Sequence, residues 1–402
     1  MTVDFLKSKA QGRVTAPPSK SYTHRALICA SFSGGTVKNI SLSQDALATL
    51  RALKTMGVQF VLKGNTVTFE KFDLKNASDG AVIDCLESAS TLRFLIPIAL
   101  LTGKQITFTG NKTLMSRPLD TYFDICKSQG IFFNKTETTL TLCGKLAPDE
   151  FYITDNISSQ FVSGLMFALP LLSGDSEIIF KSSLGSMPYI NLTANILKQF
   201  GINAEIYENK VFIKGGQTYV KNTVTVEGDY SSAAYFAALN LLGGKVTVTG
   251  LNKNSAEADK AYIEMFADLK NGKREFDLDN CIDLAPIMFA LACFFKKVKF
   301  TGTKRLKYKE SDRAVALKEE LSKIGATITV LENEVTVECK EPKCPISPIS
   351  SHNDHRIAMA MSILLSAIGG RIENTLCVSK SYPEFFEDLK HVGIEFNRKT
   401  DI

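Results

Sequence analysis

The stretch Leu53-Lys-Thr-Met-Gly57-Val-Gln-Phe60 joins the end of an amphipathic helix, a glycine and the start of a strand. A glycine in this place is typical of the left-handed residue that ends a helix. The same pattern returns along the chain, with one shortened copy at 269–272. The full copies are 125–133, 197–204, 321–328 and 389–396.

A second pattern repeats in step with the first. It is a short alternating strand that follows a helix-like apolar stretch, and such alternation is typical of a half-buried strand. Its copies are 35–40, 103–110, 174–180, 244–250, 297–302 and 370–374. The two patterns predict six copies of one α/β unit of roughly 70 residues. Six units in 402 residues fit two globular domains of three units each.

The composition places the chain among ordinary folded proteins, with 45% hydrophobic and 22% charged residues. A net charge of +5 is too small to indicate nucleic-acid binding by itself. The longest apolar run, 286–295, is far shorter than the span of about 20 residues that crosses a membrane. The first residues lack the apolar stretch of a secretory signal, so we expect none.

The nine cysteines are scattered, and no pair has C-x-x-C spacing. An odd number argues against a complete disulfide framework. Reduced thiols and a cytoplasmic location are therefore expected.

Charged side chains gather where helices are expected to begin. In Pro17-Pro-Ser-Lys20-Ser21-Tyr-Thr-His-Arg25, two prolines precede a predicted helix that carries Lys20, Ser21 and Arg25. A helix N-terminus attracts anions, so this segment is a candidate anion site. Taken alone, it is also consistent with a surface helix cap whose charges are solvated. It is not a Walker loop, because no glycine precedes Lys20.

Further helix entries carry similar groups. Arg93 falls in a first helical turn, and Arg117 precedes a helix, where it faces either an anion or Asp120. The hydroxyls of 158–160 either cap the apolar helix expected at 161–172 or donate to a phosphate. Residues 186–189 have the same hydroxyl-rich character.

The densest positive charge lies at 296–313, with eight basic and two acidic residues. Lys309, Glu310 and Arg313 fall at the mouth of a helix expected to start near Ser311. We interpret the stretch as part of an anion site, with a solvated basic strand as the alternative.

Residues 351–356 admit two interpretations. His352 and His355 have the spacing of a metal pair, but no third ligand is evident among four histidines. Asp354 as a helix cap that directs Arg356 toward a ligand is the simpler interpretation. Asp283 is either the cap of the following apolar helix or a site residue.

Most of these groups place Lys, Arg or Ser at a helix N-terminus, and they recur across the repeats. Converging N-termini from two domains would create strong positive potential. The sequence thus predicts a site for a small polyanion with more than one phosphate or carboxylate.

Several motifs together resemble those of the enolpyruvyl transferases, and most closely the branch that acts on shikimate 3-phosphate. The resemblance covers nearly the whole chain. The motifs are P-P-S-K-S-x-x-x-R at 17–25, S-R-P-L-D at 116–120, S-S-Q-F at 158–161, V-E-G-D-Y-S-S-A at 226–233, K-E-S-D-R at 309–313, N-D-H-R-I-A-M at 353–359 and K-S-Y-P-E-F-F at 380–386.

The resemblance implies an α/β fold, a two-domain inside-out α/β barrel with three βαβαββ units in each domain. It implies a discontinuous domain of 1–16 and 227–402 and an inserted domain of 17–226. It also implies domains that close on substrate, no metal or organic cofactor, a monomer, and no nucleic-acid or membrane partner.

The implied reaction transfers the enolpyruvyl group of phosphoenolpyruvate to the 5-hydroxyl of shikimate 3-phosphate through a tetrahedral ketal. The implied catalytic residues are Asp283, Glu310 and Lys20. Those implied to bind shikimate 3-phosphate are Lys20, Ser21, Arg25, Ser158, Ser159, Gln160, Ser186, Tyr189, Asp283 and Lys309. Those implied to bind phosphoenolpyruvate are Lys20, Ala89, Arg117, Gln160, Arg313, Arg356 and Lys380.

The chain departs from the family pattern at Glu87-Ser-Ala89-Ser90, where N-A-G-T is usual. The methyl group of Ala89 is expected to crowd the inhibitor glyphosate more than phosphoenolpyruvate, and so to reduce sensitivity. Arg305 and His24 also stand at variable positions, and the sequence assigns them no role.

Two alternatives are disfavoured. A UDP-N-acetylglucosamine enolpyruvyl transferase carries a reactive cysteine before its R-P-x-D motif, and the loop 110–116 has none. A nucleic-acid-binding module needs a strongly basic domain, whereas 17–226 has 20 basic and 16 acidic residues.

Overall fold

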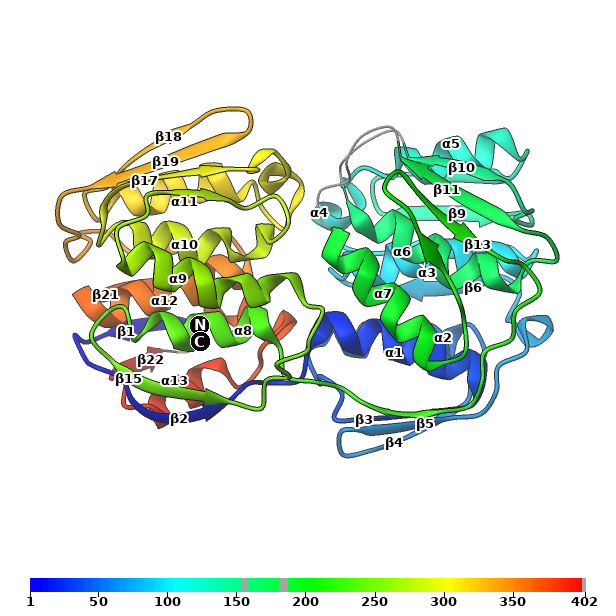
Figure 1. The fold of residues 1–402 in the computed structure, drawn as a ribbon, viewed down its shortest axis with the longest axis horizontal. Helices are drawn as coiled ribbons and strands as arrows, with labels where there is room; N and C mark the ends of the chain where they lie inside the picture. Colours follow the sequence, from blue (N-terminus) through cyan, green and yellow to red (C-terminus); the bar gives the residue numbers. More distant parts are fainter. Residues whose placement is uncertain (154–157, 181–186, 400–402) are drawn as a thin grey trace. The chain divides into compact units, whose positions relative to one another are not determined.

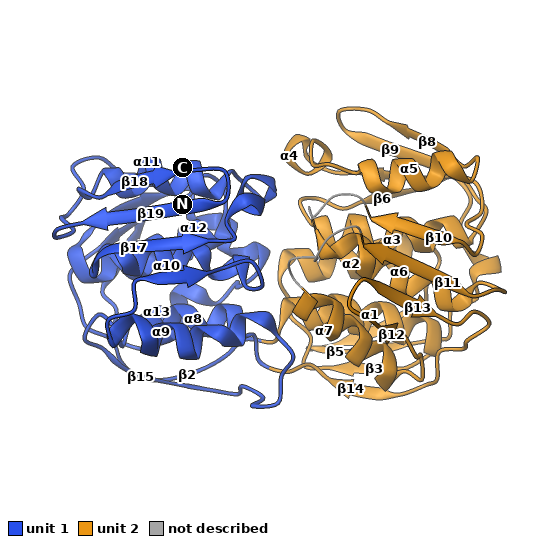
Figure 2. Ribbon diagram, turned by 45° about the horizontal axis from the view of Figure 1, so that its top comes forward, with its two compact units in different colours: residues 1–17, 228–402 blue, residues 18–227 orange. Residues whose placement is uncertain are grey.

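The computed structural model describes residues 1–153, 158–180 and 187–399, and it contains two compact units. Unit 1 comprises Met1–Pro17 and Gly228–Ile402, and unit 2 comprises Pro18–Glu227 (Figure 2). The chain passes from one unit to the other after Pro17 and again after Glu227. The boundaries expected from the sequence lie one residue earlier in each case.

Unit 2 holds the elements from α1 to β14 (Figure 1). Its helices are α1 (Lys20–Ser33), α2 (Gln44–Thr55), η1 (Leu74–Asn76), α3 (Ala89–Leu101), α4 (Lys112–Met115), α5 (Asp120–Ser128), α6 (Ser159–Ala168), η2 (Leu169–Leu171) and α7 (Met187–Gln199). Its strands are β3 (Thr36–Lys38), β4 (Phe60–Lys63), β5 (Thr66–Phe69), β6 (Ala81–Asp84), β7 (Ile106–Thr109), β8 (Phe132–Lys135), β9 (Thr139–Cys143), β10 (Glu150–Ile153), β11 (Ser176–Phe180), β12 (Glu205–Ile206), β13 (Lys210–Ile213) and β14 (Thr223–Thr225).

Unit 1 holds the two N-terminal strands and everything after β14 (Figure 1). Its helices are α8 (Tyr230–Ala238), η3 (Ala258–Ala261), α9 (Tyr262–Lys270), η4 (Ile282–Leu284), α10 (Ala285–Ala292), η5 (Lys304–Tyr308), α11 (Arg313–Ser322), α12 (His355–Ile368), η6 (Thr375–Lys380) and α13 (Phe385–His391). Its strands are β1 (Thr2–Phe5), β2 (Gln11–Thr15), β15 (Lys245–Thr249), β16 (Glu275–Asp277), β17 (Lys296–Thr301), β18 (Thr327–Val330), β19 (Glu334–Cys339), β20 (Ile349–Ser350), β21 (Gly370–Glu373) and β22 (Phe396–Lys399).

The sheets repeat one topology. In unit 2, β6 runs parallel to β7, β7 antiparallel to β9, and β9 antiparallel to β8. The orders β14-β3-β5-β4, β10-β11-β13-β12, β16-β17-β19-β18 and β20-β21-β1-β22 follow the same rule. Within the described residues the sixth copy is the parallel pair β15-β2. The predicted six-fold repeat of an α/β unit is confirmed.

The repeat depends on a glycine that reverses the chain after a helix. All six repeat glycines have positive φ, between 65° and 105°. They are Gly57, Gly130, Gly201, Gly272, Gly325 and Gly393. Residues with a Cβ adopt this conformation only at an energetic cost, so glycine fits each position.

Helices form the interior of each unit, and the sheets lie around them (Figure 1). In unit 2, α3 packs against α6, and twelve of its thirteen residues are buried. In unit 1, α10 is buried along its whole length and packs against α12 and α8. Helices that are apolar on every side require such an enclosed position. No helix in the described ranges is both long and apolar enough to span a membrane.

Two expected helix boundaries were wrong. The helix expected near Ser311 begins at Arg313, because Asp312 accepts a hydrogen bond from the Val315 amide and caps it. The helix expected at 161–172 begins at Ser159, and its last turn, η2, is a 3₁₀ helix that contains Pro170.

Candidate active site

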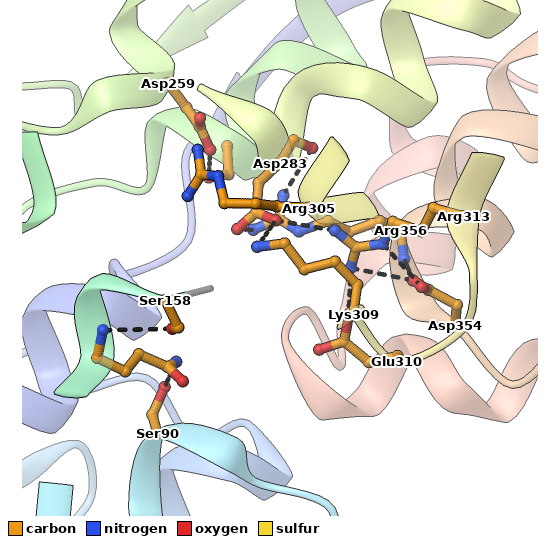
Figure 3. Close-up of polar contacts among 12 residues, drawn as sticks. Ser90, Ser158, Asp259, Asp283, Arg305, Lys309, Glu310, Arg313, Asp354 and Arg356 are labelled. Carbon is orange, nitrogen blue, oxygen red and sulfur yellow. Dashed lines mark hydrogen bonds and ion pairs between the residues drawn. The ribbon is translucent and has the colours of Figure 1, made fainter. Parts of the chain in front are cut away.

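The centre of the candidate site in unit 1 is the guanidinium of Arg313, the first residue of α11 (Figure 3). Its Nη1 lies 2.8 Å from Oδ1 of Asp283, and its Nη2 lies 2.6 Å from Oε2 of Glu310. Its Nε lies 2.8 Å from Oδ2 of Asp354. The side chain of Arg313 has no exposed surface. One buried cation therefore holds three carboxylates in fixed positions.

Two further cations reach Asp283. The Nζ of Lys309 lies 3.1 Å from Oδ1, and Nη2 of Arg356 lies 3.1 Å from Oδ2. Burial alone would raise the pKa of Asp283, but Arg356, Lys309 and Arg313 together hold that pKa well below its ordinary value. Burial lowers the pKa of Lys309, and Asp283 opposes this effect. Asp283 is thus a carboxylate held ionised by its neighbours.

Helix caps place these side chains. Asp354 caps α12 by accepting a hydrogen bond from the amide of Arg356 at 2.9 Å, as predicted. The alternative interpretation of Asp283 as a cap was wrong, because Leu284 occupies that position and Asp283 lies in η4. Lys380 ends η6, and its Nζ donates to the carbonyl of Asn353 at 2.6 Å.

The basic stretch 296–313 divides into two parts. Three of its lysines pair with glutamates at or beside the neighbouring strand β19, and Arg305 pairs with Asp279 at 3.3 Å. The lysine pairs are Lys297–Glu338, Lys299–Glu334 and Lys304–Glu332. Lys309 and Arg313 join the carboxylate cluster. Interpretation of the whole stretch as an anion site was therefore wrong for its strand portion, whose charge is largely balanced across the sheet.

In unit 2, the entry of α1 is organised by Ser19, which caps the helix by accepting from the Tyr22 amide at 3.1 Å. The Nζ of Lys20 lies 2.8 Å from Oδ2 of Asp45, which stands in the first turn of α2. Both side chains are mostly buried. Asp45 was not predicted as a site residue, because an acidic residue in a first helical turn is common and its distance from Lys20 is not visible in the sequence.

Arg25 lies one turn further along α1. Its Nε donates to Oγ1 of Thr193 at 2.8 Å, and its Nη1 donates to the carbonyl of Ser21 at 2.8 Å. Its Nη2 lies 3.4 Å from the carbonyl oxygen of Tyr189, and its Cζ lies 5.0 Å from the centre of the Phe94 ring. The structure thus brings Arg25, Ser21 and Tyr189 together. Ser186 lies outside the described residues.

At the entry of α6, the side chain of Gln160 contacts two residues of α3. Ser158 caps α6 by accepting from the Gln160 amide at 3.3 Å, and Ser159 is buried. The side-chain oxygen of Gln160 accepts from Nη1 of Arg93 at 3.0 Å, and its side-chain nitrogen donates to Oγ of Ser90 at 2.9 Å. Sequence reasoning singled out Arg93 without predicting that it holds Gln160, which is 67 residues away.

Arg93 also fixes the loop that carries Arg117. Its Nη2 donates to the carbonyl of Pro118 at 3.2 Å, and Nζ of Lys135 donates to the carbonyl of Arg117 at 3.1 Å. Arg117 itself is buried. Ala89 is the first residue of α3, directly after its cap Ser88.

Three histidines near the motifs, His24, His352 and His355, are at least partly buried. Nε2 of His352 lies 2.8 Å from Oε1 of the buried Glu320, whose other oxygen receives Nζ of Lys323 at 2.7 Å. His355 is buried in α12. Among the described residues, His352 has ligand atoms close to those of Glu319 and Glu320, and His355 does not belong to that group. His24 is buried, and burial together with Lys20 and Arg25 lowers its pKa well below the ordinary value.

Comparisons with known proteins identify the family of this chain. The family model for EPSP synthase (3-phosphoshikimate 1-carboxyvinyltransferase) matches residues 6–389. The 3-phosphoshikimate 1-carboxyvinyltransferase of Clostridium novyi is 40% identical, and the match covers 97% of each chain. That of Clostridium kluyveri is 39% identical, with 98% of each chain covered.

Solved structures have the same fold. The EPSP synthase of Acinetobacter baumannii matches with a TM-score of 0.78 and 23% identity, over 99% of this chain and 100% of that one. The enolpyruvyl transferase NikO of Streptomyces tendae matches with a TM-score of 0.79 and 15% identity, over 100% and 99%. With the family match over nearly the full length, the chain belongs to the EPSP synthase (3-phosphoshikimate 1-carboxyvinyltransferase) family.

Proposed function

We propose that this chain performs its family's reaction, enolpyruvyl transfer from phosphoenolpyruvate to shikimate 3-phosphate, with Asp283 and Glu310 as its proton-transfer pair. The observation that carries the proposal is the position of these two carboxylates on one guanidinium, that of Arg313. Two acids held in fixed positions are what an addition followed by an elimination requires.

In the addition, Glu310 gives a proton to C3 of phosphoenolpyruvate while the 5-hydroxyl oxygen bonds to C2. Asp283 takes the hydroxyl proton. In the elimination, Glu310 takes a proton back from the new methyl group, and the bond between C2 and the phosphate oxygen breaks. Asp283 returns its proton to the departing phosphate, so both carboxyl groups end as they began.

The cations around Asp283 suit a highly charged substrate. Arg313, Arg356 and Lys309 all contact this carboxylate. When the substrates bind, phosphoenolpyruvate competes with Asp283 for Arg313 and Arg356, and shikimate 3-phosphate competes with it for Lys309. Loss of its contacts with these cations makes Asp283 a stronger base. Weakening of the contact between Arg313 and Glu310 lets Glu310 hold the proton that it delivers. Substrate binding thus prepares the two acids for reaction.

The remaining assignments follow the family pattern. In unit 2, the residues that bind shikimate 3-phosphate are Lys20, Ser21, Arg25, Ser158, Ser159, Gln160, Ser186 and Tyr189. Those that bind phosphoenolpyruvate are Lys20, Ala89, Arg117 and Gln160. Lys20 also stabilises the departing phosphate. In unit 1, Lys309 contacts shikimate 3-phosphate, while Arg313, Arg356 and Lys380 contact phosphoenolpyruvate. Hydroxyl and guanidinium donors at helix N-termini are well suited to phosphate groups.

Release of inorganic phosphate from the purified protein tests the reaction. Phosphate is expected when both substrates are present and is not expected when either is omitted. Asp283→Asn is expected to lose at least about 100-fold in turnover while still binding shikimate 3-phosphate. Equal phosphate release with one substrate omitted would contradict the proposal, as would normal turnover by Asp283→Asn.

We also propose that the protein is a cytoplasmic monomer. Nine free cysteines, most of them buried, suit a reducing compartment. Sedimentation at micromolar concentration is expected to give a mass near 44.1 kDa, and cell fractionation is expected to place the activity in the cytosol. The mass of a dimer would contradict the monomer, and activity in the membrane fraction would contradict the cytoplasmic location.

A further inference from the structure

Glu320 is a buried carboxylate on α11 to which neither the motifs nor the proposed reaction gives a role. Its side chain has no exposed surface. Its Oε2 accepts hydrogen bonds from the amide of Ser350 at 2.9 Å and from Nζ of Lys323 at 2.7 Å, and its Oε1 lies 2.8 Å from Nε2 of His352. A carboxylate is tolerated in the interior where such partners satisfy it. Two of the three contacts are with one turn of the chain, residues 350–354.

The same helix also holds the other end of this turn. Arg313 and Glu320 are seven residues apart, which is close to two helical turns, so both side chains lie on one face of α11, about 10 Å apart along its axis. Nε of Arg313 lies 2.8 Å from Oδ2 of Asp354 (Figure 3). The turn between β20 and α12 is therefore fixed to α11 at both of its ends.

The backbone between these two points is strained. His352 and Asn353 are consecutive residues with φ of 51° and 54°, in the left-handed region that a residue with a Cβ adopts at an energetic cost. The amide of His352 donates to Oγ of Ser350 at 3.1 Å, and the amide of Asn353 donates to Oγ of Ser351 at 3.2 Å. A conformation of this kind persists where the surrounding contacts impose it. The two contacts from Glu320 are among those that impose it.

The conformation of the turn decides where the carbonyl of Asn353 points. That carbonyl accepts a hydrogen bond from Nζ of the buried Lys380 at 2.6 Å. An ammonium group has three donors, so this contact orients Lys380 without excluding a bond to a ligand.

Resting on the proposed function, in which Lys380 contacts phosphoenolpyruvate, we infer that Glu320 is a positioning residue for this substrate. It holds the left-handed turn, and the turn places the Asn353 carbonyl that aims the ammonium group of Lys380. Glu320 thus supports the binding of phosphoenolpyruvate through the chain 350–353, without contacting the substrate. The inference requires that the effect of Glu320 on substrate affinity depends on Lys380.

The test is a double-mutant cycle on KM for phosphoenolpyruvate. Glu320→Gln keeps the size of the side chain but leaves one acceptor oxygen for three partners, so it is expected to raise KM about tenfold and to change kcat less. In the background of Lys380→Met, the same substitution is expected to change KM less than about twofold, because no ammonium group remains to be aimed. Equal fold-changes in the two backgrounds would overturn the inference, since a general structural defect acts independently of Lys380. An unchanged KM for Glu320→Gln would overturn it as well.

Glu319 supplies a matched control on the same helix. Its Oε2 lies 3.9 Å from Nε2 of His352, beyond a hydrogen bond, and its side chain is 61% exposed. Glu319→Gln removes the same charge and is expected to leave KM unchanged. If Glu320→Gln does not fold, His352→Leu carries the test, since His352 is partly exposed and makes one of the two contacts with Glu320. It is expected to raise KM about threefold, and only where Lys380 is present.

The outcomes separate this inference from the proposed function. An inactive wild type, or a fully active Asp283→Asn, contradicts the proposed function. Independent effects of Glu320→Gln and Lys380→Met, with Asp283→Asn inactive, contradict only the role of Glu320.

Discussion

Nε of Arg313 lies 2.8 Å from Oδ2 of Asp354, and neither side chain has any exposed surface. The pair joins the N-terminus of α11 to the N-terminus of α12, because Asp354 also caps α12. Removal of one partner of a buried ion pair destabilises the fold, because the remaining charge is left buried and unpaired. This contact therefore fixes the frame on which Asp283 and Glu310 are held.

Replacement of Asp354 tests the frame. Asp354→Ala removes both the partner of Arg313 and the helix cap, and it is expected to lower the free energy of unfolding by about 3–5 kcal/mol. Asp354→Asn keeps a cap acceptor and is expected to cost less. Urea denaturation measures both. A loss below about 1 kcal/mol for Asp354→Ala would show that the pair does not support the frame.

The buried carboxyl group of Asp259 is expected to make the stability of the fold depend on pH. Its pKa of about 6 lies above the ordinary value of 3.8, so between these values the folded chain binds more protons than the unfolded chain. The stability that Asp259 contributes is present below pH 4 and is lost as the pH rises to 6. From pH 4 to pH 7 the wild type is thus expected to lose up to about 3 kcal/mol more stability than Asp259→Asn. Chemical denaturation at both pH values measures this difference, and equal losses would contradict it.

Arg93 is expected to matter for substrate affinity. It is buried, donates to Gln160 and to the carbonyl of Pro118, and its Cζ lies 4.9 Å from the centre of the Phe161 ring. Lysine cannot make these contacts together, so Arg93→Lys is expected to raise KM for phosphoenolpyruvate about tenfold and to change kcat less. The exposed Arg51 provides the control, and Arg51→Lys is expected to have no effect. A normal KM for Arg93→Lys would show that Arg93 does not support the binding of phosphoenolpyruvate.

The methyl group of Ala89 is expected to reduce sensitivity to the inhibitor glyphosate. It begins α3 and is buried, so its methyl group occupies space at the helix entry. Ala89→Gly is expected to lower the inhibition constant for glyphosate about tenfold or more while changing KM for phosphoenolpyruvate less. The physical reason is steric, because the longer ligand meets the methyl group first. Equal inhibition constants for the two proteins would refute it.

The sequence predicted the fold well where the signal was local. The glycine after each helix, such as Gly57 or Gly393, needs a positive φ, and that requirement is visible residue by residue. The capping role of Asp354 was equally local. Pairings across the fold were not predictable in this way. The sequence around Lys299 does not indicate that its Nζ lies 2.7 Å from Oε2 of Glu334, on the neighbouring strand β19.

The same limit applies to the candidate site. The K-E-S-D-R motif at 309–313 pointed to Glu310 and Arg313, and the family resemblance implied Asp283, but their mutual contacts depend on how η4 and α11 pack. Charge counting treated the strand lysines and Arg313 alike, although Lys297 and Lys299 pair with glutamates of the facing strand. Asp259 gave no signal in the sequence, because its burial depends on how η3 packs in the fold.

Hydrogen exchange at C3 of the enolpyruvyl group tests the central claim most directly. In the ketal, C3 is a methyl group whose hydrogens are equivalent, so elimination removes any of them. In D₂O the wild type is therefore expected to place deuterium in the vinyl group of the product, seen by ¹H NMR, and Glu310→Gln is expected to form no such product. A product that keeps both original vinyl hydrogens would contradict proton delivery to C3, and with it the paired roles of Glu310 and Asp283.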